Sequence, residues 1–198
     1  MAGAPGNALQ HADHLVSPPT RLVRARRVRR GGEYLRVAHP AWSDPFDTSF
    51  SRRVGGRWNP PGSFGALYLN RDIRTASANA RRFLSEQGGF SLFDLKPERR
   101  PVAVRCTVSA RLLANGVTGK GLLALGLPPA YPWQVGWDRC QPIGARLREA
   151  GETGIAARSA AEPAGSGRWV GEEAVLFEPA RGVRRGRVLP FNEWYWLR

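Results

Sequence analysis

A loop rich in glycine and proline presents one arginine in a way that suggests chemistry. Residues 55–62 read Gly-Gly-Arg-Trp-Asn-Pro-Pro-Gly, with Arg57 directly after the two glycines. Glycines let a backbone adopt conformations closed to other residues and approach a ligand closely. Prolines restrict the residues that lead out of the loop. A stiff loop that holds an arginine predicts a binding site for an anion.

A second arginine, Arg36, stands in an otherwise apolar segment. Residues 34–38 read Tyr-Leu-Arg-Val-Ala and precede His39-Pro40, which predicts a strand that ends before the proline. A buried arginine is costly unless an anion or a carboxylate meets it, so such a position is often functional. The alternative is that Arg36 faces solvent across the pleat of the strand.

The elements around these arginines predict a mixed fold. The loop leads into an expected strand at 65–69, which carries Tyr68, and then into an expected helix at 72–87 with Asp72 as N-cap. Further strands are expected at 91–95, 102–108, 154–157 and 174–177, and a short helix at 142–150. Because strands and helices are mixed without regular alternation or an internal repeat, the sequence predicts a single α+β domain.

Length and charge suggest a tail followed by one domain. The expected division of the 198 residues is a disordered, arginine-rich tail at 1–32 and a folded domain at 33–198. The net charge is +14, from 30 basic and 16 acidic residues, so the surface attracts polyanions. Segment 21–30 holds six arginines and no acid. It is either an electrostatic arm for nucleic acid or an acidic protein, or a solvated leader.

Membrane and metal sites are not expected. No apolar run approaches the roughly 18 residues of a membrane helix, and residues 1–20 lack the apolar core of a secretory signal. The expected location is the cytoplasm. The two cysteines, Cys106 and Cys140, lie far in sequence from the three histidines, so no metal is implied. Cys106 alternates with valines in an expected strand and is predicted to be a core residue.

Several of these segments together resemble the RES domain family, which is named for its arginine, glutamate and serine. They follow the family's order from about residue 33 to the end of the chain, and the Gly-Gly-Arg-Trp-Asn-Pro-Pro-Gly run is specific enough to indicate membership. The matching segments are Tyr34–Val37, Gly55–Gly62, Leu67–Leu69, Thr75–Ala76, Gln141–Gly144, Gly154–Ile155, Arg158–Ser159, Glu173–Pro179 and Leu189–Phe191.

The resemblance carries an expected function. RES proteins are typically toxins of bacterial toxin–antitoxin pairs, and their fold is similar to that of ADP-ribosyltransferases. The resemblance implies NAD as substrate, cut at the nicotinamide–ribose bond with water, phosphate or a protein nucleophile as acceptor. It also implies a helix-turn-helix antitoxin that blocks the nucleotide cleft. Such chemistry needs arginines for the pyrophosphate, an aromatic ring for the nicotinamide and a carboxylate for the cationic ribosyl centre.

By the same resemblance, individual residues receive expected roles. Arg36 and Arg57 would hold the pyrophosphate, Tyr68 would stack on the nicotinamide, and Ser159 would hydrogen-bond the nicotinamide riboside or position its loop. Arg57, Ser159 and Asn79, the residue at the family's carboxylate position, are the candidate catalytic residues. Taken alone, Tyr68 is more simply a sheet-packing residue and Ser159 a turn hydroxyl.

The expected carboxylate is replaced by an amide. In the family the helix usually carries Thr-Ala-x-x-Glu, whereas here Thr75–Ala76 leads to Asn79. An amide has a similar shape but no charge. Glu86 and Asp72 are each two helical turns away, about 10 Å along the axis, which is far for a direct replacement. The sequence therefore leaves open a weakened enzyme, an inactive one, or one in which another carboxylate has taken over, and it predicts that activity rises in Asn79→Glu.

Three functions are open from the sequence alone. The first is an NAD-cleaving or ADP-ribosylating RES enzyme. The second is a catalytically inactive RES-like protein that binds a nucleotide or a partner, which Asn79 favours. The third is a basic nucleic-acid-binding protein that uses the arginine-rich segment. Nucleic acid is the least favoured partner, because no helix-turn-helix, RRM or KH pattern accompanies the charge.

Overall fold

Strands dominate the part of the chain that the computed structural model describes, which is residues 25–85, 91–161 and 171–195. Within these residues there are six strands, five α-helices and one short 3-10 helix. In chain order they are β1 (Arg27–Ala38), α1 (Ser49–Val54), β2 (Ala66–Asn70), α2 (Ile73–Ser85), η1 (Pro97–Arg99), β3 (Val102–Gly116), α3 (Gly119–Ala124), α4 (Trp137–Glu149), β4 (Gly154–Arg158), β5 (Glu172–Phe177), β6 (Val183–Leu189) and α5 (Phe191–Trp194).

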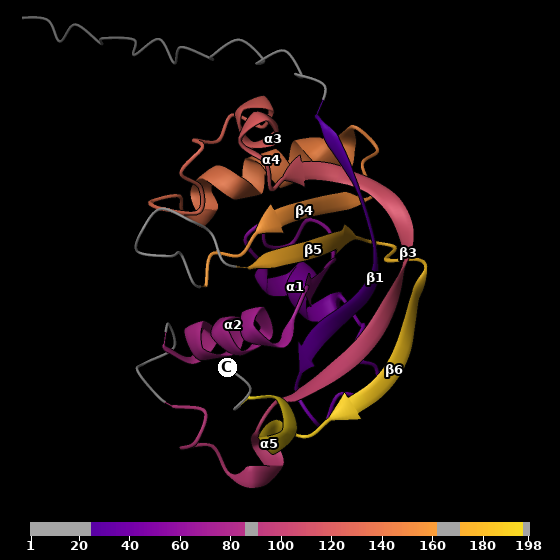
Figure 1. Cartoon of the computed structure of the whole chain (residues 1–198), viewed down its shortest axis with the longest axis vertical. Coiled ribbons are helices and arrows are strands. Elements are labelled where there is room, and N and C mark those ends of the chain that lie inside the picture. The colour runs from indigo at the N-terminus through magenta and orange to yellow at the C-terminus, as the bar shows by residue number, and fades with distance from the viewer. Residues whose placement is uncertain (1–24, 86–90, 162–170, 196–198) are drawn as a thin grey trace, which may run out of the picture.

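The first five described strands close into a ring. β1 pairs with β2, β2 with β5, β5 with β4, β4 with β3, and β3 with β1, while β6 pairs with the N-terminal half of β3, on the edge that pairs with β4 near its C-terminal end. The β3–β4 pair is parallel and the others are antiparallel. Strands β1 and β3 curve together along one side of the molecule, with β6 beside β3 (Figure 1). Closure pairs strand edges that would otherwise be open to other chains.

The inner face of the ring is an apolar core. Leu67 and Leu69 of β2 lie opposite Leu176 and Ala174 of β5, and all four side chains are buried in one cluster. Tyr34, Cys106 and Ala156 join that cluster from β1, β3 and β4. The expectation that Cys106 is a core residue is confirmed, and burial raises the pKa of its thiol to about 11.

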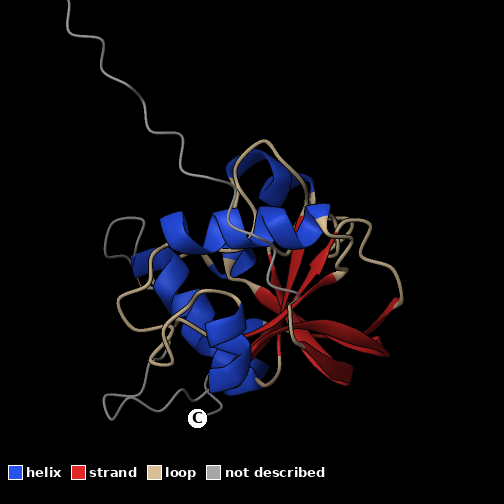
Figure 2. Cartoon of the chain, turned by 90° about the horizontal axis from the view of Figure 1, so that it is seen from above, coloured by secondary structure: helices blue, strands red, loops and turns tan. Residues whose placement is uncertain are grey.

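The outer face of β2, β5 and β4 carries a second core, because side chains alternate across a strand. Val175, Phe177 and Ile155 pack there with residues of α3 and α4, including Leu122, Ile143 and Leu147. Trp58 of the glycine-rich loop is fully buried in this core, 5.9 Å from the ring of Tyr131. Figure 2 shows the helices gathered along one side of the strands.

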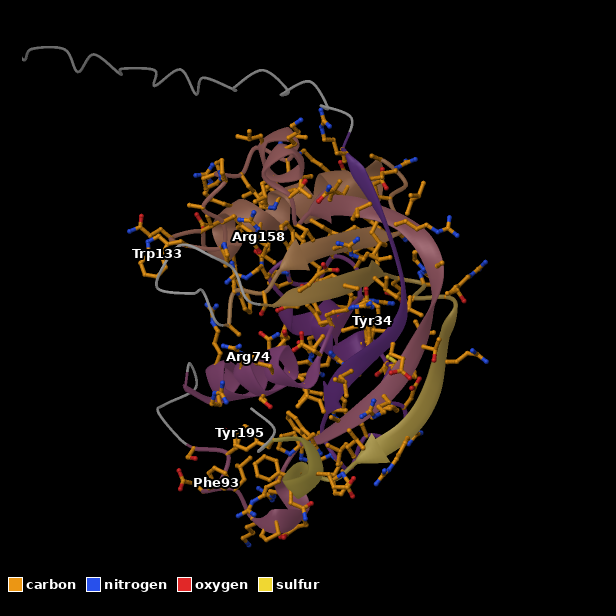
Figure 3. The ribbon with its side chains drawn as sticks, viewed as in Figure 1. Tyr34, Arg74, Phe93, Trp133, Arg158 and Tyr195 are labelled. Carbon is orange, nitrogen blue, oxygen red and sulfur yellow. The ribbon has the colours of Figure 1, made fainter. Side chains whose placement is uncertain are left out.

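A third cluster of aromatic residues forms around α5. Phe93 meets the rings of Phe191 and Tyr195 at 5.6 and 5.4 Å, and Figure 3 shows Phe93 and Tyr195 together beside α5. The strand expected at 91–95 is wrong. Ser91 and Asp94 instead form a turn, in which the Asp94 carboxylate accepts from the Ser91 backbone N–H at 2.8 Å. The apolar residues of this segment join a cluster with α5 and residues of β1, β3 and β6, without pairing to a strand.

Strand β1 begins before the expected start of the domain at residue 33. It includes Arg27 and Arg30, which were expected in the disordered tail. Carboxylates from distant segments explain the difference. The Arg27 guanidinium donates to Glu152 at 2.9 Å, and the Arg30 guanidinium donates to Glu172 at 2.5 and 3.0 Å. Residues 1–24 of the expected tail lie outside the described residues.

Most other expected elements occur, with altered ends. Helix α2 is present and the Asp72 carboxylate accepts from the Thr75 backbone N–H at 2.7 Å, as an N-cap does. Helix α4 begins at Trp137 and contains Pro142, where the sequence predicted its start. The α+β class is confirmed. No helix within the described ranges is long and apolar enough to cross a membrane.

Candidate active site

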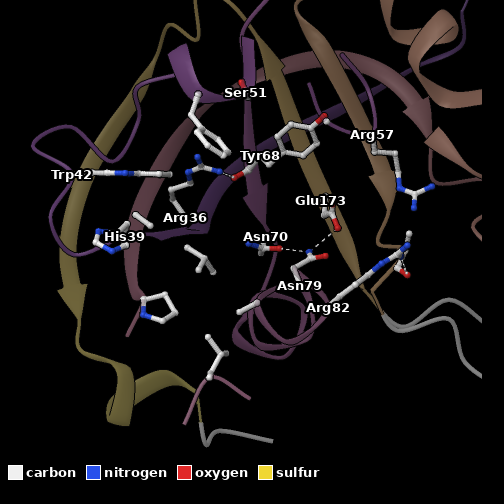
Figure 4. A pocket seen from close by; sticks show the side chains of 18 of the residues that line it. Arg36, His39, Trp42, Ser51, Arg57, Tyr68, Asn70, Asn79, Arg82 and Glu173 are labelled. Atoms are coloured by element: carbon white, nitrogen blue, oxygen red, sulfur yellow. Dashed lines mark hydrogen bonds between the residues drawn. The ribbon is translucent and has the colours of Figure 1, made fainter. Parts of the chain in front are cut away.

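A pocket of about 560 Å³ opens beside β2, β5 and α2 (Figure 4). Its volume falls within the roughly 300–1,000 Å³ of common small-molecule sites. The wall is largely apolar and also carries aromatic and basic side chains, with one carboxylate among its described residues. The polar, charged and aromatic residues of that wall are Arg36, His39, Trp42, Phe50, Ser51, Arg57, Tyr68, Asn70, Asn79, Arg82, Arg99, Trp137 and Glu173.

The glycine-rich loop is held in place by its own asparagine. The Asn59 amide nitrogen donates to the backbone carbonyls of Ser51 and Phe64, at 2.7 and 3.0 Å. Gly55 follows α1 with φ of 77°, a conformation that glycine adopts without strain. The loop is therefore stiff for two reasons, and it carries Arg57 to the edge of the pocket.

Tyr68 fixes the same loop from the adjacent strand. Its hydroxyl accepts from the Trp58 backbone N–H at 2.9 Å and donates to the Asn59 side-chain oxygen at 2.8 Å. A Cβ atom on Gly56 would lie 2.5 Å from this hydroxyl, so the glycine makes room for it. Burial raises the pKa of Tyr68, which keeps the hydroxyl protonated and able to donate. The ring of Tyr68 also lines the pocket.

Tyr68→Phe should therefore destabilise the fold. The Trp58 backbone N–H and the Asn59 oxygen would lose their partner, at a cost of about 1–3 kcal/mol for buried polar groups left unpaired. Denaturant unfolding measures this cost. Tyr34→Phe is the matched control, because the buried Tyr34 hydroxyl makes no hydrogen bond to the described residues. Equal stability of Tyr68→Phe and wild type would contradict this role.

Arg57 is anchored on one side and open to the pocket on the other. Its Nη1 donates to the backbone carbonyl of Val135 at 2.8 Å and approaches the Cys140 sulfur at 3.9 Å. No carboxylate of the described residues pairs with it. Next to it, the Trp58 backbone packs directly on Gly144 of α4, where a Cβ atom would collide with the Trp58 carbonyl oxygen. Helix α4 thus sets the position of the loop.

Arg36 points inward, at the end of the ring that meets the pocket. Its guanidinium donates to the carbonyls of Pro45 and Tyr68, each at 3.2 Å, and lies 5.8 Å from the Trp42 ring centroid. Figure 4 shows the head group beside Trp42 and Tyr68. Burial lowers the pKa of Arg36 to about 10, so it remains a cation at neutral pH. The described chain offers this cation no carboxylate.

Asn79 contacts a carboxylate that the sequence reading passed over. Its amide nitrogen donates to Glu173 Oε1 at 2.7 Å and to Asn70 Oδ1 at 2.6 Å (Figure 4). Asn70 and Glu173 are direct cross-strand neighbours on β2 and β5, so their side chains share the face that carries Tyr68. Glu173 is 8% exposed and has no cationic partner in the described ranges.

The structure brings four of the five predicted site residues together. Arg36, Arg57, Tyr68 and Asn79 all line the pocket. Ser159 does not belong to its described wall, although the next residue, Ala160, does. The Ser159 side chain is buried, and its hydroxyl accepts from the Ala161 backbone N–H at 3.3 Å, which is the contact of a turn hydroxyl.

The pocket residues that were not predicted from the sequence include Glu173, Asn70 and the aromatic residues Trp42, Phe50 and Trp137. The sequence held one usable signal for Glu173. A charged residue precedes the apolar run Ala-Val-Leu-Phe, so it marks either a strand end or a site. In the described segments no three His, Cys, Asp or Glu side chains group as a metal ion would require.

Comparison with known proteins gives a family match and a match in fold. The family model described as "RES domain" matches residues 22–192. A chain in the crystal structure of the M. tuberculosis MbcT–MbcA toxin–antitoxin complex superposes with a TM-score of 0.70 at 18% identity, over 85% of this chain and 91% of that one. A search of curated proteins finds no match. At this identity the superposition shows that the fold is shared.

Proposed function

Because the chain belongs to the RES domain family, we propose that it binds NAD and cleaves the nicotinamide–ribose bond. One observation carries the proposal. The pocket contains a partly buried, desolvated cation, Arg36, and a buried carboxylate, Glu173, and neither has a partner of opposite charge among the described residues. Unpaired buried charges are costly, so they favour a ligand that supplies both counter-charges. NAD has an anionic pyrophosphate and a cationic pyridinium ring.

The remaining wall suits the same ligand. Arg36 and Arg57 offer guanidinium donors to phosphate oxygens, and a planar guanidinium can bind phosphate through two parallel hydrogen bonds. The Tyr68 ring offers an aromatic surface near Glu173 for the nicotinamide. In this arrangement the pyrophosphate lies toward the arginines and the nicotinamide riboside toward β5.

The reaction breaks the bond between the ring nitrogen and C1′ of the ribose. Both bonding electrons go to the nitrogen, and nicotinamide leaves as a neutral molecule. The ribosyl carbon gains positive charge until the acceptor oxygen bonds to it. With water as acceptor, the products are ADP-ribose, nicotinamide and a proton released to solvent. The site contributes orientation of the substrate, exclusion of water around the ring and electrostatic stabilisation of the cationic centre.

The biological role that we propose is that of a toxin held in check by an antitoxin protein in the cytoplasm. Trp42, Phe50 and Trp137 are 39%, 41% and 44% exposed where they line the pocket, and exposed aromatic residues are frequent in protein interfaces. A partner that covers them would close the pocket to NAD. A helix-turn-helix antitoxin with an acidic segment suits this basic chain.

Nicotinamide release from NAD by the purified protein tests the proposed function. Wild type should release one nicotinamide for each NAD consumed. In Arg57→Ala, which removes one phosphate donor, turnover should fall about 10- to 100-fold, the equivalent of about 1.5–3 kcal/mol for a hydrogen bond to a charged group. Arg53→Ala is the matched control, because this exposed arginine of α1 does not line the pocket.

Two other results would point to the alternative functions. NAD binding without nicotinamide release at high protein concentration would leave a catalytically inactive, nucleotide-binding RES protein. Retention of RNA or DNA that falls steeply with rising salt, together with no NAD binding, would favour the nucleic-acid function.

A further inference from the structure

We propose that Glu173, on β5, supplies the catalytic carboxylate of this site, and that Asn79 and Asn70 position it. The proposal rests on the proposed function, because it assigns a role in the cleavage of NAD. The family resemblance predicts the carboxylate on helix α2, where this chain has Asn79. The structure places Glu173 within hydrogen-bond distance of that residue, on the wall of the same pocket.

The hydrogen bonds define what each of the three residues can do. The Asn79 amide nitrogen donates both of its hydrogens, one to Glu173 and one to Asn70, at 2.7 and 2.6 Å. Asn70 in turn donates to the Leu35 backbone carbonyl at 3.3 Å. This chain of contacts orients the Asn79 amide and fixes one oxygen of Glu173. The other carboxylate oxygen is left for the substrate.

The neighbouring acid on the same strand shows why Glu173 differs from a structural carboxylate. Glu172 is equally buried, but its carboxylate pairs with Arg30 on β1. Strand alternation turns Glu173 to the other face, toward the pocket. It receives an amide hydrogen bond there in place of a cation. Because its described partners are neutral amides, no protein cation there competes with a cationic ligand for this carboxylate.

This geometry gives Glu173 one task in the reaction. As the bond to nicotinamide breaks, positive charge moves from the pyridinium ring to the ribosyl carbon. A fixed carboxylate stabilises that developing charge without reorganising at the moment of reaction. Glu173 forms no covalent bond and takes no proton in this step. Asn79 acts only through Glu173 and is a positioning residue.

The contact between Asn79 and Glu173 reverses the result expected for Asn79→Glu. A glutamate at position 79 would place a second carboxylate against Glu173. Two carboxylates that share a site cannot both remain charged at low cost, so one would be protonated or displaced. Activity should fall and not rise, although the substitution restores the family residue.

The test compares Glu173→Gln, Asn79→Glu and Glu172→Gln with wild type. A glutamine at 173 can still accept from Asn79 but lacks the charge, so kcat should fall about 100- to 1,000-fold, and KM for NAD should also rise because the bound pyridinium ring loses its counter-charge. Asn79→Glu should lose at least about tenfold in kcat. If repulsion between the two carboxylates shifts the pKa of the site by one unit, the stabilisation of the transition state changes about tenfold. Glu172→Gln should unfold at a lower temperature than wild type. At temperatures below its own melting temperature, its kcat should equal that of wild type.

Binding of NADH gives a readout that does not require turnover. NADH has the same pyrophosphate but an uncharged ring, so wild type should bind NAD more tightly than NADH. Glu173→Gln should remove that preference while still binding NADH, which also demonstrates that the variant is folded. If wild type is active, unchanged turnover in Glu173→Gln or higher turnover in Asn79→Glu would overturn only the role proposed for Glu173. Wild type that releases no nicotinamide would overturn the proposed function itself.

Discussion

Replacing Arg36 with methionine should abolish most NAD binding without weakening the fold. We expect the dissociation constant for NAD to rise at least about 100-fold, because loss of a buried, hydrogen-bonded charge partner costs about 2–5 kcal/mol. The free energy of unfolding should stay equal or rise, since removing a desolvated charge that lacks a carboxylate partner is often neutral or stabilising. Calorimetric titration and denaturant unfolding of the same preparation measure the two quantities.

Arg105→Met provides the comparison for this experiment. Arg105 lies opposite Leu35 on the neighbouring strand β3, and its side chain is 47% exposed. It does not line the pocket, so neither NAD affinity nor stability should change by more than a small amount. If Arg36→Met lost about 2 kcal/mol of stability and kept its affinity for NAD, Arg36 would be a structural residue and the anion site would be wrong.

A methyl group at Gly144 should damage both the fold and the site. The Cβ atom of Gly144→Ala would collide with the Trp58 carbonyl oxygen, and backbone atoms cannot turn aside as a flexible side chain can. Either α4 or the glycine-rich loop must shift. We expect a loss of about 1–3 kcal/mol in stability, as overpacked cores show. Because Arg57 is next to Trp58, turnover should also fall about 100-fold for a displacement near 1 Å.

Gly119→Ala separates this collision from the general effect of replacing a helical glycine. No atom lies within 4 Å of a Cβ atom at Gly119, the first residue of α3, so its stability should stay within about 0.5 kcal/mol of wild type. Thermal unfolding and nicotinamide release, measured on both variants, distinguish the collision from the general effect of replacing a glycine. Wild-type values in Gly144→Ala would mean that α4 does not set the position of the loop.

Features encoded by neighbouring residues could be predicted from the sequence. Glycine and proline spacing identified the loop of Arg57, and apolar alternation identified β2 and the first half of β3. Asp72 was recognised as an N-cap because its partner, Thr75, is three residues away. Each of these depends on backbone geometry within a short segment, where residue type and spacing are informative.

Features that depend on distant pairing could not be predicted. The partner of Asn79 is 94 residues away, and only the register of β2 and β5 brings Glu173 to it. The early start of β1 depends on Glu172, 142 residues from Arg30. Strand β6 carries exposed arginines and lacks an apolar face, so its sequence resembles a loop. A local pattern holds no information about such partners.

The alternation along β2 separates the residues that fill the ring from the residues that line the pocket. Leu67 and Leu69 face the interior of the ring, while Tyr68 and Asn70 face the pocket. A slip of one residue in the pairing with β5 would exchange the two sets, so the apolar interior enforces the register that the pocket requires. Substitutions on the pocket face of β2 can therefore change substrate specificity while the apolar residues of the interior face keep the strand register unchanged.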